Sequence, residues 1–140
     1  MDRNVVKLSF PTSETAARLE RDLSDQGRTV VYGIYFDFAS DAIKEESEPV
    51  LKQIADVMIK NPTWLLSVEG HTHNFGGNEA NLQLSQRRAT AVSKALGERY
   101  KIPSTRLEPT GFGEARPKAT NETIEGRALN RRVELVRIGR

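Results

Sequence analysis

Two histidines separated by one residue, His71 and His73, are the first residues in this chain whose spacing suggests chemistry. Residues two apart in a β-strand project from the same face, so these imidazoles could bind a metal ion together with Asp37 or Glu69. The same spacing arises in any strand, however, and it specifies no third ligand. We therefore predict no metal site and interpret His71 as a structural residue at a strand end, hydrogen-bonded within the fold.

Arginine pairs form a second group, at 87–88 and 131–132, and adjacent basic residues can indicate a nucleic-acid surface. Acidic residues are interleaved with them, and the net charge of the chain is only +2. A solvated surface of mixed charge accounts for most of these arginines, and we predict no nucleic-acid partner. Arg127 and Arg132 are assigned structural roles.

Arg88 differs from the other arginines because of its spacing from Asn81. Asn81 lies seven residues earlier, two helical turns, so the two side chains should project from one face of a helix. A planar guanidinium beside an amide can bind a carboxylate. The alternative for Arg88 is a salt bridge to a neighbouring carboxylate of the chain itself.

The chain carries no pattern typical of an enzyme. Ser85 has no histidine or lysine at an informative spacing, a Gly-x-Ser-x-Gly motif is absent, and no pair of carboxylates is set apart as acid and base. The glycines fit turns better than a phosphate-binding loop. We predict a non-enzymatic domain without a cofactor.

Apolar periodicity and turn residues predict alternating helices and strands that would position these side chains. The predicted order is a helix at 12–25, a strand at 30–38, a helix at 45–60, a strand at 64–71, a helix at 78–100, a strand at 106–110, a helical turn at 122–129 and a strand at 132–138. Residues 111–113 are expected to bend the chain away from the sheet. This order predicts an α+β fold with helices on one face of a small mixed sheet.

Length and composition place the chain among globular domains. Its 140 residues suffice for one domain, and 37% hydrophobic with 29% charged residues excludes the disordered class and a membrane span. The N-terminus has no long apolar segment of the kind that exports a protein. There is no cysteine, so the cysteine content does not indicate whether the protein works in an oxidising or a reducing compartment.

Four clusters, in this order and spacing, resemble the OmpA-like domain shared by outer membrane protein A, the peptidoglycan-associated lipoprotein and MotB. They are Tyr35-Phe36-Asp37-Phe38; Gly70-His71-Thr72; Asn81-x-x-Leu84-Ser85-x-x-Arg88-Ala89-x-x-Val92; and Gly111-Phe112-Gly113-Glu114-x-x-Pro117 followed by Asn130-Arg131-Arg132-Val133-Glu134. Each cluster alone is weakly specific, whereas the ordered set is specific. Together they cover most of the chain.

The resemblance implies a two-layer sandwich with a βαβαβ core on a mixed four-stranded sheet, here with an extra N-terminal helix. We expect an N-terminal helical extension at 1–29 and the OmpA-like domain at 30–140. The family implies non-covalent binding of peptidoglycan through the diaminopimelate of its peptide stem. It also implies a place on the periplasmic side of a bacterial cell envelope, within a longer outer-membrane protein or lipoprotein, with other envelope proteins as candidate partners.

The resemblance also implies which residues bind the ligand. Arg88 matches the arginine that binds the ligand carboxylate, and Asn81 matches a position that lines the site. The remaining residues that match the family's pocket are Phe36, Asp37, Phe38, Thr72, His73, Leu84 and Arg131.

His73 departs from the family motif, which reads Gly-His-Thr-Asp, with the aspartate paired to the ligand ammonium. A neutral imidazole accepts one hydrogen bond, and an imidazolium accepts none and repels a cation. We therefore expect a ligand affinity weakened by roughly ten- to a hundred-fold. Ala39 also occupies a position that is often polar in relatives. These departures favour one alternative, an OmpA-like fold that has lost wall binding and acts as a protein interaction module.

Overall fold

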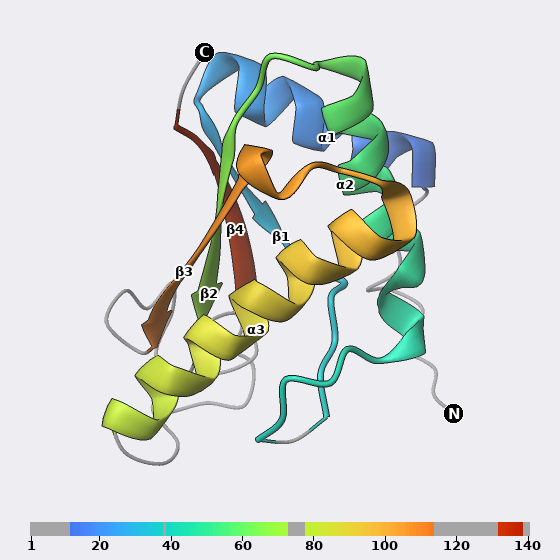
Figure 1. Cartoon of the computed structure of the whole chain (residues 1–140). Helices are drawn as coiled ribbons and strands as arrows, with labels where there is room; N and C mark the ends of the chain where they lie inside the picture. The colour runs from blue at the N-terminus through green and yellow to red at the C-terminus, as the bar shows by residue number, and fades with distance from the viewer. Residues whose placement is uncertain (1–11, 38, 73–77, 114–131, 139–140) are drawn as a thin grey trace.

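Three α-helices cover one face of a four-stranded sheet in the part of the chain that the structure describes (Figure 1). The structure is a computed structural model that describes residues 12–37, 39–72, 78–113 and 132–138. Phe38, His73, Arg131 and the helical turn predicted at 122–129 lie outside these residues. Among the described helices, none has the length and apolar character that crossing a membrane requires.

The sheet is mixed, as predicted. Its strands are β1 (Arg28–Val31), β2 (Leu66–His71), β3 (Leu107–Gly113) and β4 (Arg132–Arg137), in the spatial order β1-β4-β2-β3. Strands β2 and β3 are parallel, whereas β4 runs antiparallel to both β1 and β2. The two-layer α+β architecture expected from the sequence is therefore confirmed.

The three helices match the predicted periodic segments. They are α1 (Thr12–Asp25), α2 (Glu48–Lys60) and α3 (Asn78–Tyr100), with short 3₁₀ turns at Glu45–Ser47 and Ser104–Arg106. Helix α2 begins later than predicted because Glu45–Ser47 forms the tighter turn, and Pro49 lies in the first turn of the α-helix, where no backbone N–H is needed.

The core lies between the helices and the sheet. Alternate residues of β2 and β4, such as Val68 and Leu135, point to the helical face and are fully buried or nearly so. Leu19 and Leu23 of α1 belong to this same cluster, and neither is exposed to solvent. Helix α1 therefore packs as part of the core, while the expected division between 1–29 and 30–140 stays a prediction.

The first predicted strand, 30–38, is wrong beyond Val31, and the observed strand begins two residues earlier, at Arg28. Strand β1 ends at Val31, and residues 32–37 leave the sheet. The cause is Gly33, whose φ of +112° is a conformation that residues with a side chain rarely adopt. A Cβ at this position would lie only 2.6 Å from Cγ2 of Val50. The β-branched and aromatic residues after Gly33 therefore pack as a loop, in which Phe36 forms one isolated bridge with Ile43.

The predicted bend at 111–113 is also wrong, because these residues complete β3. A Cβ on Gly111 would lie 2.4 Å from the backbone nitrogen of Gln86, and one on Gly70 would lie 2.3 Å from the carbonyl oxygen of Ser85. These glycines are needed because the α3 backbone packs directly against β2 and β3.

Candidate ligand-binding site

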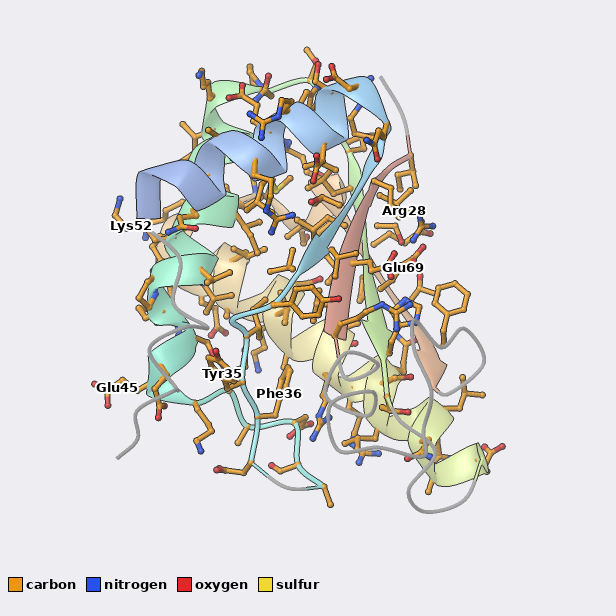
Figure 2. All side chains as sticks on the ribbon, turned by 180° about the vertical axis from the view of Figure 1, so that it is seen from behind. Arg28, Tyr35, Phe36, Glu45, Lys52 and Glu69 are labelled. Carbon is orange, nitrogen blue, oxygen red and sulfur yellow. The ribbon has the colours of Figure 1, made fainter. Side chains whose placement is uncertain are left out.

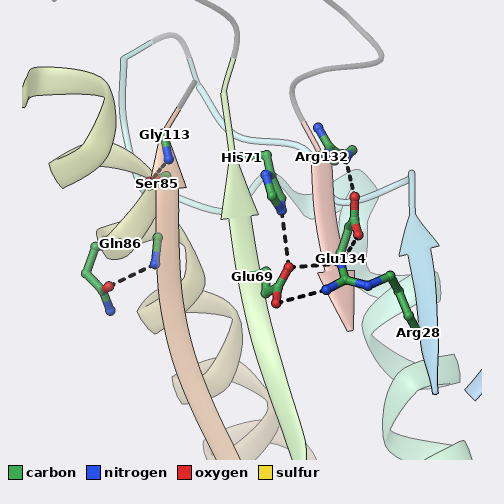
Figure 3. Close-up of polar contacts among 9 residues, drawn as sticks. Arg28, Glu69, His71, Ser85, Gln86, Gly113, Arg132 and Glu134 are labelled. Atoms are coloured by element: carbon green, nitrogen blue, oxygen red, sulfur yellow. Dashed lines mark hydrogen bonds and ion pairs between the residues drawn. The ribbon is translucent and has the colours of Figure 1, made fainter. Parts of the chain in front are cut away.

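The first part of the site lies where α3 meets the carboxyl ends of β2 and β3. The backbone N–H of Gly113 donates to Oγ of Ser85, and that of Gly111 donates to Oε1 of Gln86, at 2.8 and 2.9 Å (Figure 3). A Cβ on Gly113 would lie 3.2 Å from the carbonyl carbon of Asn81. Glycine at 113 thus lets α3 place Asn81 against the end of β3.

Thr72, the residue directly after β2, joins this cluster. Its backbone N–H donates to the carbonyl oxygen of Gly113 at 2.8 Å, and the absence of a Cβ on Gly113 leaves room for the α3 backbone at Asn81 and Leu82. Thr72 is 4% exposed, and its hydroxyl oxygen makes no hydrogen bond in the described part of the chain. A buried hydroxyl is normally satisfied, so this one is suited to a ligand or a water molecule.

The second part of the site is the Arg88 guanidinium, which two backbone carbonyls orient. Its Nε donates to the oxygen of Ser40 at 2.8 Å, and Nη2 donates to the oxygen of Asp37 at 3.2 Å. The guanidinium carbon also lies 4.7 Å from the centre of the Phe36 ring, within the range of a cation–π contact. Both acceptors are backbone carbonyls, so these two bonds fix the orientation of the guanidinium.

The structure therefore brings the predicted site residues together in two groups. Phe36 and Asp37, on the segment after β1, contact Arg88, and Figure 2 shows Phe36 on this segment below Tyr35. Thr72 and the α3 backbone at Asn81 both lie beside Gly113, while Leu84 is half-buried on α3, one turn before Arg88. Their ligand-binding roles stay predictions, and Phe38, His73 and Arg131 lie outside the described residues.

Sequence reasoning missed Ser40 and Ser85 as parts of this arrangement. Ser40 contributes a backbone carbonyl, which its side-chain type does not reveal, whereas Ser85 supports Gly113 through its hydroxyl and donates to the carbonyl of Leu82. The Gly-x-Gly spacing at 111 and 113 was the available signal for Ser85, because it indicates a close approach of another backbone.

A second polar cluster lies on the sheet face opposite the helices. Arg28 contacts both Glu69 and Glu134, and Arg132 donates from Nε to Glu134 (Figure 3). Figure 2 shows Arg28 above Glu69 on this face. Both glutamates are nearly fully buried. Burial alone would raise the pKa of Glu134, but hydrogen bonds from Arg132 and Arg28 outweigh burial and hold that pKa below its ordinary value.

His71 belongs to this cluster and is a structural residue, as predicted. Its Nε2 lies 3.4 Å from Oε1 of Glu69, and its ring stacks on Phe112 with centroids 5.3 Å apart. Burial lowers the pKa of His71, and the positive charge of Arg132 lowers it further.

Glu69, His71 and Glu134 also place potential metal-ligating atoms within 4.8 Å of one another. The carboxylates already accept hydrogen bonds from Arg28 and Arg132, whose positive charges balance them. The cluster therefore has the chemistry of an internal ion-pair network. These three residues also differ from the candidate metal ligands that the sequence suggested, in which His71 was paired with His73.

Comparison with known proteins identifies the class of domain that this fold and site define. Residues 35–131 match the OmpA family, and the chain belongs to that family. It is 45% identical over 101 residues to outer membrane porin F of Pseudomonas aeruginosa, covering 72% of this chain and 29% of the porin. It is 37% identical over 135 residues to the probable lipoprotein YiaD of Escherichia coli, covering 96% of this chain and 61% of YiaD. The chain thus spans less than two thirds of either protein.

Solved structures give the same result. The peptidoglycan-associated lipoprotein of Burkholderia pseudomallei superposes with a TM-score of 0.67 at 32% identity, covering 74% of this chain and 86% of the lipoprotein. The cell wall anchor of the type VI secretion system of Pseudomonas aeruginosa superposes with a TM-score of 0.69 at 31% identity, covering 89% of this chain and 96% of the anchor. Membership of this family makes the chain a non-enzymatic domain on the periplasmic side of a bacterial cell envelope.

Proposed function

We propose that this domain anchors a cell-envelope protein to the cell wall by binding the diaminopimelate of the peptidoglycan peptide stem. The observation that carries the proposal is the Arg88 guanidinium, which two loop carbonyls and the Phe36 ring hold in one orientation. A guanidinium held in this way can bind a carboxylate with two parallel hydrogen bonds. The free amino acid end of diaminopimelate supplies such a carboxylate.

Asn81 and Thr72 support the proposal from the other part of the site. Asn81 lies two turns before Arg88 on the same helix face, so the two residues are about 10 Å apart along the helix axis. An extended arginine side chain and a small ligand can together span that distance. The buried Thr72 hydroxyl supplies one more polar group. The proposed site then has hydrogen-bonding groups from α3 and from the residue directly after β2, and a cation from α3.

His73 supplies the weak half of the proposed site. An aspartate at this position would pair with the ligand ammonium, whereas histidine offers at most one acceptor nitrogen. We propose that the domain retains carboxylate recognition by Arg88 and binds the ammonium feebly. The resulting affinity would be roughly ten- to a hundred-fold below that of an aspartate-containing site.

The direct test is a calorimetric titration of the chain with diaminopimelate and with soluble wall fragments. We expect saturable binding that Arg88→Ala abolishes and His73→Asp strengthens by about tenfold or more. Arg87→Ala is the matched control, because Arg87 is the adjacent residue on α3 and is half-exposed, with the Asp41 carboxylate at 3.8 Å. The control should bind like the native chain.

A pH series tests the assigned role of His73. If the imidazole faces the ligand ammonium, raising the pH from 5.5 to 8 deprotonates it and should tighten native binding. The His73→Asp variant should lose this dependence. A flat native profile would count against a His73 contact with the ammonium while leaving the Arg88 contact intact.

The replacement of aspartate by His73 also favours a second candidate function, a protein interaction module that has lost the wall ligand. No saturable binding by the native chain at millimolar ligand, together with recovery of binding in His73→Asp, would support this second function.

A further inference from the structure

Ala39 adopts a backbone conformation that residues with a side chain rarely occupy. Its φ is +53°, and the only other described non-glycine residue with positive φ is Lys101, at +65°. Lys101 directly follows α3, and its N–H donates to the carbonyl of Gly97 while the next N–H donates to that of Leu96, a common helix termination. Ala39 follows no helix, so its left-handed conformation needs a different explanation.

The segment around Ala39 is a small hairpin held by its own hydrogen bonds. The N–H of Ser40 donates to the carbonyl of Asp37 at 3.1 Å, and Oγ of Ser40 accepts from the N–H of Ala42 at 3.0 Å. Farther from the tip, Phe36 bridges Ile43. These contacts close the loop without any contribution from the Ala39 side chain.

The left-handed residue lies between the two carbonyls that orient Arg88. The oxygen of Asp37 accepts from Nη2, and the oxygen of Ser40 accepts from Nε. The N–H of Ser40 donates to the carbonyl of Asp37, which closes a tight turn, and Ala39 with its positive φ lies inside that turn, between the two acceptors. A residue at 39 that cannot adopt positive φ would change the path of this turn, and with it the relative placement of the two carbonyls.

We propose that Ala39 is a positioning residue, whose left-handed conformation holds the Asp37 and Ser40 carbonyls on the Arg88 guanidinium and so orients that cation before the ligand arrives. This inference rests on the proposed function, in which Arg88 binds the ligand carboxylate. Orienting the long arginine side chain in advance reduces the conformational entropy that binding would otherwise cost. The conformation at 39 thereby contributes to affinity without touching the ligand.

Substitutions at 39 that differ in their tolerance of positive φ test the proposal. Glycine and asparagine adopt this conformation readily, whereas the β-branched valine disfavours it strongly. We expect Ala39→Gly to bind diaminopimelate within about twofold of the native chain, Ala39→Asn to bind at least as tightly as the native chain, and Ala39→Val to bind about tenfold more weakly. Ala42→Val is the matched control, because Ala42 is exposed in the same loop and has no positive φ. This control should bind like the native chain.

A second measurement separates positioning from a general effect on stability. Hydrogen exchange of the Arg88 Nε–H, followed by nitrogen-15 NMR without ligand, reports the bond to the Ser40 carbonyl directly. We expect faster exchange in Ala39→Val and native-like exchange in Ala39→Gly, Ala39→Asn and Ala42→Val.

Native-like Nε–H exchange in Ala39→Val would overturn the proposal, and so would native-like affinity of that variant where the native chain binds. If the native chain binds no diaminopimelate, the proposed wall-binding function fails. The exchange experiment would then still decide whether Ala39 positions Arg88.

Discussion

Glu69 of β2 and Glu134 of β4 stand directly opposite each other in adjacent antiparallel strands, and both carboxylates contact the single guanidinium of Arg28. Like charges opposed across two strands destabilise a sheet unless a cation lies between them. Arg28 supplies that cation from β1, on the far side of β4. The contact therefore links three strands whose segments are far apart in the sequence.

Removing the Arg28 cation should destabilise the fold. Arg28→Met leaves two buried carboxylates with less compensation, and we expect a loss of about 1–3 kcal/mol in the free energy of unfolding, since Arg28 itself is partly exposed. Lys52→Met is the matched control, because Lys52 pairs with Asp56 on the exposed side of α2, and it should change stability by less than about 0.5 kcal/mol. Urea denaturation of both variants measures the difference. Equal, small losses would show that the three-strand contact contributes little.

His71 should make the fold less stable as the pH falls from 7 to 5. Burial and the charge of Arg132 lower the pKa of His71 in the folded state, although Glu134 and Glu69 raise it in part. The unfolded chain therefore binds a proton near pH 6.5 while the folded chain does not, so the free energy of unfolding decreases below that pH. The pKa of Glu134 is also lowered on folding, which adds a further loss in more acidic solution, below about pH 4.5.

Denaturation at several pH values checks this expectation. The loss between pH 7 and 5 should be smaller in His71→Gln than in the native chain. The chain has only two histidines, so His73→Gln is the natural control and should follow the native curve. Superimposable curves for His71→Gln and the native chain would contradict the prediction.

A side chain at Gly111 should separate α3 from the sheet. The added methyl of Gly111→Ala would meet the backbone of Gln86 at 2.4 Å, and backbone cannot move aside as a flexible side chain can. We expect a loss of about 1–3 kcal/mol or more, measured by chemical denaturation. Gly97→Ala is the control, because its nearest contact would be 3.3 Å, and its stability should stay within about 1 kcal/mol of the native chain. A tolerated Gly111→Ala would mean that α3 can shift at little cost.

Helix α1 should contribute to the stability of the whole described fold. Leu23 is fully buried in the common core, so Leu23→Ala should cost about 2–5 kcal/mol. Leu82→Ala is the control, because Leu82 is 44% exposed, and its effect should be within about 0.5 kcal/mol. A single cooperative transition with a lower midpoint is the expected result in urea. An unchanged main transition would support the expected division of the chain near residue 30.

The periodicity of the sequence predicted the three helices because each has a continuous apolar stripe that only a helical period collects on one face. Helix α3 was predicted with its observed bounds, Asn78–Tyr100, and the placing of Asn81 and Arg88 on one face follows from helical geometry alone. Strand β4 was predicted to within one residue for a similar reason, since its alternating pattern has a period of two.

Prediction of secondary structure from the sequence was wrong where a long-range contact determines the local backbone conformation. Val30–Phe38 has the composition of one strand, but Gly33 packs against Val50 of α2 and turns the chain. The glycines at 111 and 113 have the composition of a bend, but α3 packs over them and keeps them in β3. Local composition contains no information about a neighbour that is distant in the chain.

By itself, the sequence determined the α+β class, the helices and the arginine that the family motif places on α3, because periodicity and motif spacing are local properties. Tertiary structure alone decided that Arg88 would be oriented by the carbonyls of Asp37 and Ser40, and that Arg28 would join two glutamates from other strands. These contacts join residues about 40 to 100 positions apart, and they form only when burial of the common core brings their elements together.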